Sequence, residues 1–409
     1  MSIDPAAETA RWLATLSPED TARAISYTQG GHWLLLWGAI VSIAVAWIII
    51  RTGVLSGIRD RLERRRKRPK LVSLLAGVTW LLMSFVLTLP WSIYESWWRE
   101  KQYGLTSQPL TGWLTEALIS TAISVVFMGL LIVALYFIIR HARRLWWAWG
   151  AGLTAVAVIF MLLVSPILIE PLFNTYTPAP DGPVRDAVVE LAHATGTPDD
   201  KIYIFDGSKQ SDRYTANVSG LFGSARVAMS DVMFKKGADI PEVRGVVGHE
   251  MGHYVHMHSL WITGIFILLA AAGFFLIDRL FPLAKRLLGA DRVGEISDPA
   301  GLPVLAAIGA VLGLLATPVM STLVRTIEAD ADHFSMVHAN EPDGLSKALI
   351  KTAEYRAPSP SAIEEFIFYD HPSVGNRVRR AMEWKAAHPA NAPSAAAAAP
   401  AAVAVTPTP

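Results

Sequence analysis

The sequence has no cysteine and few charged residues. The absence of cysteine excludes disulfide scaffolds, thiol nucleophiles, iron–sulfur clusters and cysteine-based zinc sites. Any metal ion must therefore be held by histidine, aspartate or glutamate. Charged residues make up only 17% of the chain, and 36 basic residues balance 35 acidic ones, so the protein has no overall basic field. We therefore expect no nucleic-acid partner.

Apolar residues, by contrast, make up 52% of the chain, which is unusual for a water-soluble protein. Runs of roughly 20 apolar residues are long enough to cross a bilayer. We expect about six spans, at residues 32–50, 71–90, 117–139, 145–169, 259–278 and 302–324. The lipid bilayer is thus an expected partner, and the predicted fold class is mainly α, a polytopic membrane helical bundle.

Polarity divides the rest of the chain into segments. Residues 175–258 turn polar and contain two short strand-like runs, 201–206 and 226–230, which predict a small α+β unit. The expected organisation is a polar N-terminal segment, a membrane domain of four spans, a second domain that joins the polar unit to the last two spans, and a disordered Ala/Pro tail. These four regions correspond to residues 1–31, 32–174, 175–388 and 389–409. The Ala-rich tail is typical of a bacterial host, so we expect a multi-pass protein of the bacterial inner (plasma) membrane.

Basic residues concentrate in three connections between spans. Loop 51–70 carries most of them, and residues 140–144 and 285–292 fall on the same side of the membrane if the predicted spans hold. Because basic loops remain in the cytoplasm, this distribution places the polar domain on the opposite side.

The motif with the clearest chemistry is His249-Glu250-x-x-His253, in a helix-compatible context just before the fifth span. On a helix the two histidines share one face and can bind one Zn²⁺ ion, while Glu250 lies beside them to accept a proton from water. The motif therefore predicts a zinc-dependent hydrolase with one Zn²⁺ ion per chain.

A catalytic zinc site needs a third protein ligand. His256 lies seven residues beyond His249, about 10 Å along a helix, which is too far for one ion, and we also disfavour His258. Glu328 is a better candidate, because it follows the sixth span on a helical segment with Asp332 one turn further along. Asp332 can then accept the ring N–H of a zinc-binding histidine. The alternative is that these acidic residues simply begin a solvated helix.

Several blocks, in order over about residues 70–385, resemble the CAAX prenyl protease 1 family of integral-membrane zinc metallopeptidases. The matching blocks are Leu89–Tyr94, Arg99–Leu105, Ser165–Asn174, Thr177-Pro178, Gly248–His253 and Arg325-x-x-Glu328-x-x-Ala331-Asp332. The resemblance implies a small zincin-like α+β domain that hydrolyses peptide bonds. It also implies a membrane bundle, although eukaryotic members have seven spans and a catalytic domain that faces the cytoplasm.

The resemblance also assigns roles to residues of this chain. It implies that Glu328 is the third zinc ligand and that Asp332 supports the zinc-binding histidines. It places two further residues near the active site, His371 as an oxyanion stabiliser and Arg377 as a residue that helps hold the site.

Residues 214–220 resemble the family's edge strand, which pairs with the substrate backbone. Thr215 and Asn217 are the candidate substrate-binding residues there. The family commonly has Asn-Ala where this chain has Thr215-Ala216, so its backbone-binding asparagine has no clear counterpart.

The function predicted from the sequence is an integral-membrane zinc metalloendopeptidase that acts on peptides or on CAAX-type or unfolded proteins. One alternative is an intramembrane site-2-type protease, which takes its third ligand from an Asp-Gly pair. Asp343-Gly344 is such a pair, but it lies in a polar segment and is better suited to the start of a helix. The other alternative is a non-catalytic zinc-binding membrane scaffold.

Overall fold

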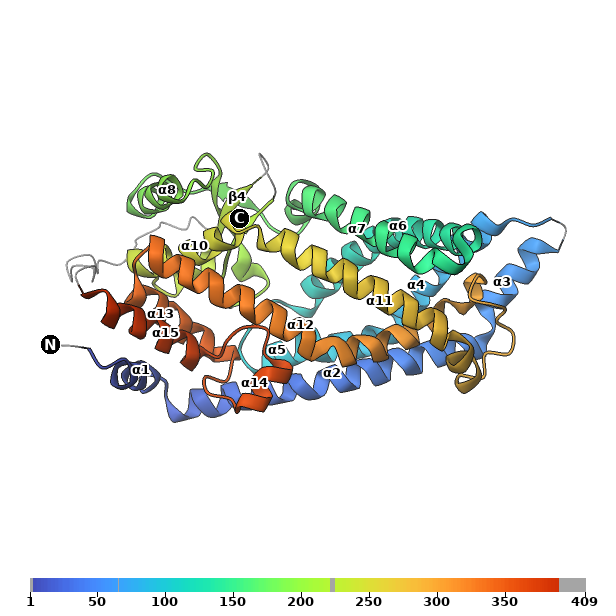
Figure 1. Cartoon of the computed structure of the whole chain (residues 1–409), viewed down its shortest axis with the longest axis horizontal. Helices are drawn as coiled ribbons and strands as arrows, with labels where there is room; N and C mark the ends of the chain where they lie inside the picture. Colours follow the sequence, from blue (N-terminus) through green and yellow to red (C-terminus); the bar gives the residue numbers. More distant parts are fainter. Residues whose placement is uncertain (1–2, 65, 221–224, 390–409) are drawn as a thin grey trace.

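The protein is an elongated helical bundle with a small mixed domain at one end. The computed structural model describes residues 3–64, 66–220 and 225–389. Figure 1 shows the long helices running roughly along the molecule, with α8, α10, α13 and α15 gathered at one end and α3 at the other. The long helices are α2 (Pro18–Thr52), α4 (Pro69–Ile93), α6 (Leu110–Ala142), α7 (Trp146–Val164), α11 (His258–Leu287) and α12 (Leu302–His338).

Five helical segments of the described residues are long and apolar enough to cross a membrane. They are Pro18–Thr52, Pro69–Gln102, Leu110–Leu172, His258–Leu287 and Pro299–His338. The third has 63 residues, too many for one crossing, and the chain turns back within it at Arg143–Leu145, so that α6 and α7 lie against each other. The expected count of about six is therefore approximate, while the mainly helical, multi-pass fold class is confirmed.

The membrane helices expose large apolar side chains on their outer faces. Leu130, Val156, Leu268 and Leu315 are each more than 60% exposed. A water-soluble protein rarely exposes such continuous apolar surface, whereas a bilayer solvates it. The first of these helices begins at Pro18, inside the segment 1–31, which also contains α1 (Pro5–Leu13).

A four-stranded sheet forms the centre of the mixed domain, in the order β1-β2-β4-β3. The strands are β1 (Tyr176–Pro178), β2 (Ile202–Phe205), β3 (Ala216–Ser219) and β4 (Arg226–Ser230). β2 pairs parallel with β4, while β1 and β3 pair antiparallel with their neighbours. β2 and β4 lie where the sequence predicts strands, and β3 is an outer strand within the predicted 214–220.

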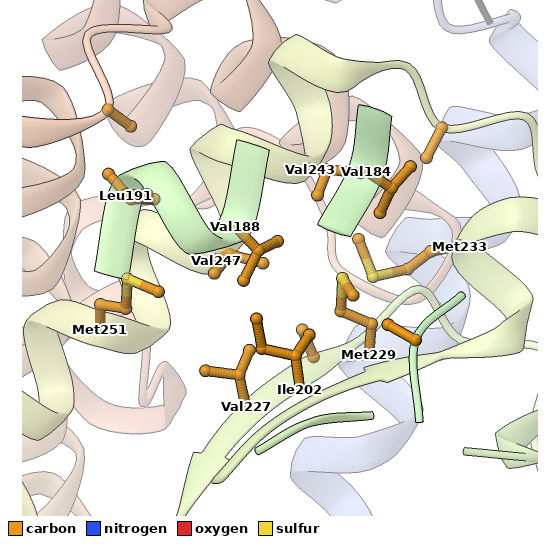
Figure 2. Packing of buried hydrophobic residues seen from close by; sticks show 14 of the residues in the cluster. Val184, Val188, Leu191, Ile202, Val227, Met229, Met233, Val243, Val247 and Met251 are labelled. Atoms are coloured by element: carbon orange, nitrogen blue, oxygen red, sulfur yellow. The ribbon is translucent and has the colours of Figure 1, made fainter. Parts of the chain in front are cut away.

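One face of this sheet is covered by α8 (Pro183–Thr195) and α10 (Ile240–Val255). Figure 2 shows Val188 of α8 and Val247 of α10 above Ile202 and Val227 of the sheet, in a core that also contains Met251. Val247 and Met251 alternate along α10 with the residues of the metal-binding motif. The same helix therefore packs its apolar side on the sheet and turns its histidines toward α12.

Shorter helices complete the structure. They are α3 (Val54–Glu63), α5 (Arg99–Gln102), α9 (Asp231–Lys235), α13 (Pro342–Thr352), α14 (Ala362–Phe368) and α15 (Val374–Ala387). α13 and α15 pack against each other and enclose α12 together with α10. Of the expected disordered tail, residues 390–409 lie outside the described residues, and the predicted four-part division of the chain stays a prediction.

Candidate metal centre

The helix that carries the motif is fixed firmly at its start. Asp239 caps α10, and its side chain and that of Glu242 form a reciprocal capping box. Glu242 is fully buried, and its carboxylate lies 2.6 Å from Lys351 Nζ and 3.0 Å from Lys347 Nζ of α13. This buried charge is thus neutralised by two lysines, which joins α10 to α13.

Three glycines on α10 allow its close contact with the neighbouring helices. A Cβ atom at Gly252 would lie 3.0 Å from Phe334 Cβ and 3.2 Å from the Cα of Ala331, both on α12. At Gly248 it would lie 3.0 Å from Ser335 Oγ of α12, and at Gly245 2.9 Å from a backbone nitrogen of α13. The glycines are three and four residues apart, so they form one face of the helix. This face brings the α10 backbone close enough to α12 for the histidines to reach the acidic residues there.

The side chains of His249, His253 and Glu328 converge between α10 and α12. The Nε2 atoms of the two histidines lie 3.1 Å apart. Glu328 Oε2 lies 3.2 Å from His249 Nε2, and Glu328 Oε1 lies 3.5 Å from His253 Nε2. The spacing of the motif and the downstream glutamate thus place three potential ligands around one point.

This arrangement fits a cation. Glu328 Oε2 is buried and has no hydrogen bond of good geometry within the described part of the chain, although ring nitrogens of His249 and His371 lie nearby. Two imidazole nitrogens that face one another beside an unpaired carboxylate oxygen are poorly satisfied by protons alone. Two histidines and one glutamate are a common donor set of catalytic zinc sites.

A buried group of charges fixes the orientation of His249. Its Nδ1 lies 2.9 Å from Asp332 Oδ1. Arg377 of α15 in turn donates from Nε to Asp332 Oδ2 at 2.7 Å and from Nη2 to Oδ1 at 2.6 Å. Since Asp332 is 1% exposed and Arg377 7% exposed, the pair is shielded from water. Nδ1 of His249 is therefore directed at an acceptor, which leaves Nε2 for a metal ion.

Glu250 is adjacent to this group but does not join it. Its partial burial raises its pKa to about 7; the charge of His249 lowers this pKa, whereas the charge of Glu328 raises it. A carboxyl group with a pKa near neutrality can both accept and return a proton at physiological pH.

His371 and Arg325 connect the C-terminal part of the chain to the site. His371 Nε2 lies 3.1 Å from Glu328 Oε2, and its Nδ1 lies 2.8 Å from Asp370 Oδ1. Burial lowers the pKa of His371, which favours its neutral form. Arg325 of α12 donates to the backbone carbonyls of Glu365 and Tyr369, so it holds the segment that carries His371 against α12. This contribution of Arg325 was not identified from the sequence, although Arg325 belongs to a matched motif.

The two candidate substrate-binding residues differ in their surroundings. Thr215 is exposed, and its backbone carbonyl accepts a hydrogen bond from Ser230 N–H at 3.0 Å. Asn217 lies on the outer strand β3, which contacts α10, and its Oδ1 atom is buried without a hydrogen bond among the described residues. The geometry therefore offers a free acceptor at Asn217 and only a surface side chain at Thr215.

Comparisons with known proteins identify the family. A model described as peptidase family M48 matches residues 178–385, and one described as CAAX prenyl protease N-terminal, five membrane helices, matches residues 8–175. The chain belongs to peptidase family M48. It is therefore a metalloprotease with a membrane domain, and the resemblance inferred from the sequence motifs is confirmed.

Relatives from distant organisms match most of the M48 chain. One, described as "Uncharacterized metalloprotease YhfN", is from Bacillus subtilis and is 26% identical over 90% of this chain and 86% of its own length. Another, a CAAX prenyl protease 1 homolog of Arabidopsis thaliana, is 27% identical over 75% of this chain and 72% of its own. The crystal structure of S. mikatae Ste24p has the same fold, with a TM-score of 0.71 at 22% identity over 90% of this chain and 89% of that one.

Proposed function

We propose that this M48 protein is a zinc-dependent endopeptidase whose metal is held by His249, His253 and Glu328. The observation that carries the proposal is that the Nε2 atoms of the two histidines and the carboxylate oxygens of Glu328 lie within 3.5 Å of one another. A bound Zn²⁺ ion would supply Lewis-acid polarisation of the scissile carbonyl. Zinc is favoured over harder cations because two of the three donors are imidazoles.

The residues around the metal centre have separate tasks in this proposal. Glu250 accepts a proton from the attacking water and returns it to the leaving amine, which a pKa of about 7 permits. His371 stabilises the oxyanion from its Nε2 side, and because its Nδ1 hydrogen goes to Asp370, this role requires the doubly protonated ring. Asp332 and Arg377 keep His249 in the tautomer that presents Nε2 to the metal.

The outer strand β3 provides a place for an extended peptide. Its outer edge, which pairs with no other strand in the described part of the chain, can pair with substrate backbone, as in other strand-addition complexes. Asn217, whose buried Oδ1 has no hydrogen bond among the described residues, can accept a backbone N–H of the peptide once its side chain turns outward. This requirement for an extended chain favours flexible peptides and unfolded proteins as substrates.

A large apolar cavity lies next to this strand. Its volume is about 760 Å³, and its lining includes Ala157 of α7, Phe266 of α11 and Val218 to Gly220 at the end of β3. Such a cavity can accommodate a hydrocarbon chain attached to the peptide, which supports CAAX-type substrates. Several relatives are named CAAX prenyl proteases.

The cellular location is proposed to be a bacterial inner (plasma) membrane, since a matching relative comes from Bacillus subtilis. The basic connections lie at the end opposite the metal centre: Arg59 of α3 pairs with Asp298, and Arg140 contacts Ser73 (Figure 1). By the charge rule this end faces the cytoplasm.

The two alternative functions receive less support. Asp343, the candidate ligand of a site-2-type protease, lies on α13 and forms an ion pair at 2.6 Å with Lys385 of α15, so its carboxylate is already engaged. A non-catalytic scaffold would not need Glu250, which nonetheless stands beside the metal-binding group.

The test is cleavage by purified protein in detergent of an unfolded peptide, with and without a C-terminal prenyl group. Treatment with a chelator should abolish cleavage, and Zn²⁺ should restore it better than Mg²⁺. Ala157→Phe should raise KM for the prenylated peptide and leave KM for the unprenylated peptide unchanged. The control Val156→Phe, on the exposed face of α7, should change the KM of neither peptide. Equal activity after complete removal of the metal would reject the proposal.

A further inference from the structure

A second group of potential metal ligands lies beside the metal centre and has no part in the proposed mechanism. His256 Nδ1 contacts Asp330 Oδ2, and His258 Nε2 lies 3.1 Å from the same oxygen. His258 is 6% exposed, whereas His256 and Asp330 have side chains that are 40% and 46% exposed. Two imidazoles thus converge on one carboxylate oxygen, with one side open to water.

The backbone between the two histidines has an uncommon conformation. α10 ends at Val255, α11 begins at His258, and Met257 between them is left-handed, with φ of 52°. A residue other than glycine, asparagine or aspartate seldom adopts this conformation, which costs of order 1 kcal/mol or more in a helix, and such strain gathers at functional sites. The side chain of Met257 is 58% exposed, so its packing does not explain the strain. The turn at Met257 is what directs both histidine rings to Asp330.

We propose that His256, His258 and Asp330 form a second divalent-metal site, and that occupation of this site inhibits the enzyme. Two neutral imidazole nitrogens and one carboxylate oxygen favour Zn²⁺ and similar ions such as Co²⁺, and water can complete the coordination on the exposed side. The ligand atoms of the three residues all lie within 4.8 Å of one another. The inhibitory effect, though not the binding itself, rests on the function proposed above.

A direct contact couples the second site to the first. His258 Nδ1 lies 3.1 Å from His253 Nδ1. When His253 uses Nε2 to hold the catalytic metal, its Nδ1 carries a hydrogen, and His258 Nδ1 must accept it. His258 then keeps its own hydrogen on Nε2 and donates it to Asp330.

A metal ion at the second site reverses this pattern. It takes His258 Nε2, so the hydrogen of a neutral His258 moves to Nδ1 and faces the Nδ1–H of His253. Two donors then oppose each other, and His253 loses the acceptor that orients it. Excess metal should therefore weaken the hold of His253 on the catalytic ion and reduce cleavage.

The test is a metal titration of the full-length protein in detergent, from which metal has first been removed. Glu250→Gln serves as the background for binding, so that no cleavage is required. We expect Co²⁺ to bind in two steps, with two distinct absorption spectra. His256→Gln should lose the weaker step, since even residues behind the ligands change metal affinity by about 10- to 100-fold. The matched control is His193→Gln. It removes another exposed histidine that pairs with an aspartate, Asp199 at 2.6 Å, at a place where the described residues supply no third ligand.

Cleavage assays with rising Zn²⁺ give a second, independent readout. The native protein and His193→Gln should be inhibited by excess Zn²⁺, and His256→Gln should cut at the native rate but resist inhibition. A single metal per chain, or inhibition that His256→Gln leaves unchanged, would overturn the second site. Two metal ions per chain without any cleavage would instead contradict the proposed function but would still support the second metal site.

Discussion

Replacing Asp332 with asparagine should lower both the free energy of unfolding and the affinity for zinc. The substitution keeps the shape of the side chain but removes a buried charge that Arg377 contacts twice. Removing one partner of a buried ion pair leaves the other charge unpaired and typically costs about 3–5 kcal/mol of unfolding free energy. Loss of a partner behind a zinc-binding histidine weakens zinc affinity by about 10- to 100-fold, or roughly 1.4–2.8 kcal/mol.

A second substitution separates the two effects. In Asp332→Asn/Arg377→Met the unpaired guanidinium is gone, so most of the lost stability should return. Zinc affinity should remain low, because His249 Nδ1 still faces a neutral amide instead of a carboxylate. Asp343→Asn is the control, since Asp343 also pairs with a cation, Lys385, but lies on α13 with 40% of its side chain exposed.

The assays are thermal unfolding of the metal-free protein in detergent and zinc affinity by competition with a chelating dye. Native zinc affinity in Asp332→Asn would refute the role of Asp332 in orienting His249. A double variant as unstable as Asp332→Asn would refute the explanation of the stability loss by an unpaired arginine.

Three further predictions follow from other parts of the structure. Gly252→Ala should push α10 away from Phe334 and the α12 backbone, which separates the histidines from Glu328. Metal analysis should therefore show a lower zinc content together with lower activity, and unchanged zinc content would contradict this. Asn217→Ala should raise KM for an unfolded peptide several-fold with little change in kcat, because one hydrogen bond contributes about 0.5–1.5 kcal/mol, and an effect on kcat alone would argue against strand pairing. Burial, helped by the charges of Asp239 and Asp343, raises the pKa of Glu341 to about 7 from 4.5 in spite of Arg244. This carboxyl therefore favours folding fully below pH 4.5, and the contribution is lost as pH rises through about 7. Glu341→Gln should thus show a smaller fall in melting temperature between pH 5 and pH 8 than the native protein, and an equal fall would reject the shift.

Much of the metal centre could be predicted from the sequence because helix geometry is local. The four-residue spacing of His249 and His253 places them on one face of any helix. Glu328 and Asp332 were identified in the same way, as one face of a helix that continues from a membrane span. The structure brings these four residues together, but their roles remain proposals.

The contacts between helices could not be predicted from these local patterns. The glycine face of α10 has a regular spacing, Gly245, Gly248 and Gly252, which is a signal of close helix packing, but the helices that it contacts, α12 and α13, lie far away in the sequence. The rise of a continuous helix excluded His256 as a ligand of the first site, yet it could not show that the helix breaks at Met257. That break places His258 against His253 and Asp330.

The most direct test of the proposed zinc peptidase compares the native protein with Glu250→Gln in two measurements on the same purified samples. The measurements are zinc content and the rate at which an unfolded peptide is cut. We expect both proteins to contain one tightly held zinc ion, with cleavage lost only in Glu250→Gln, because Glu250 handles the proton and does not bind the metal. Cleavage at the native rate by Glu250→Gln, or native protein that neither holds zinc nor cuts the peptide, would contradict the proposal.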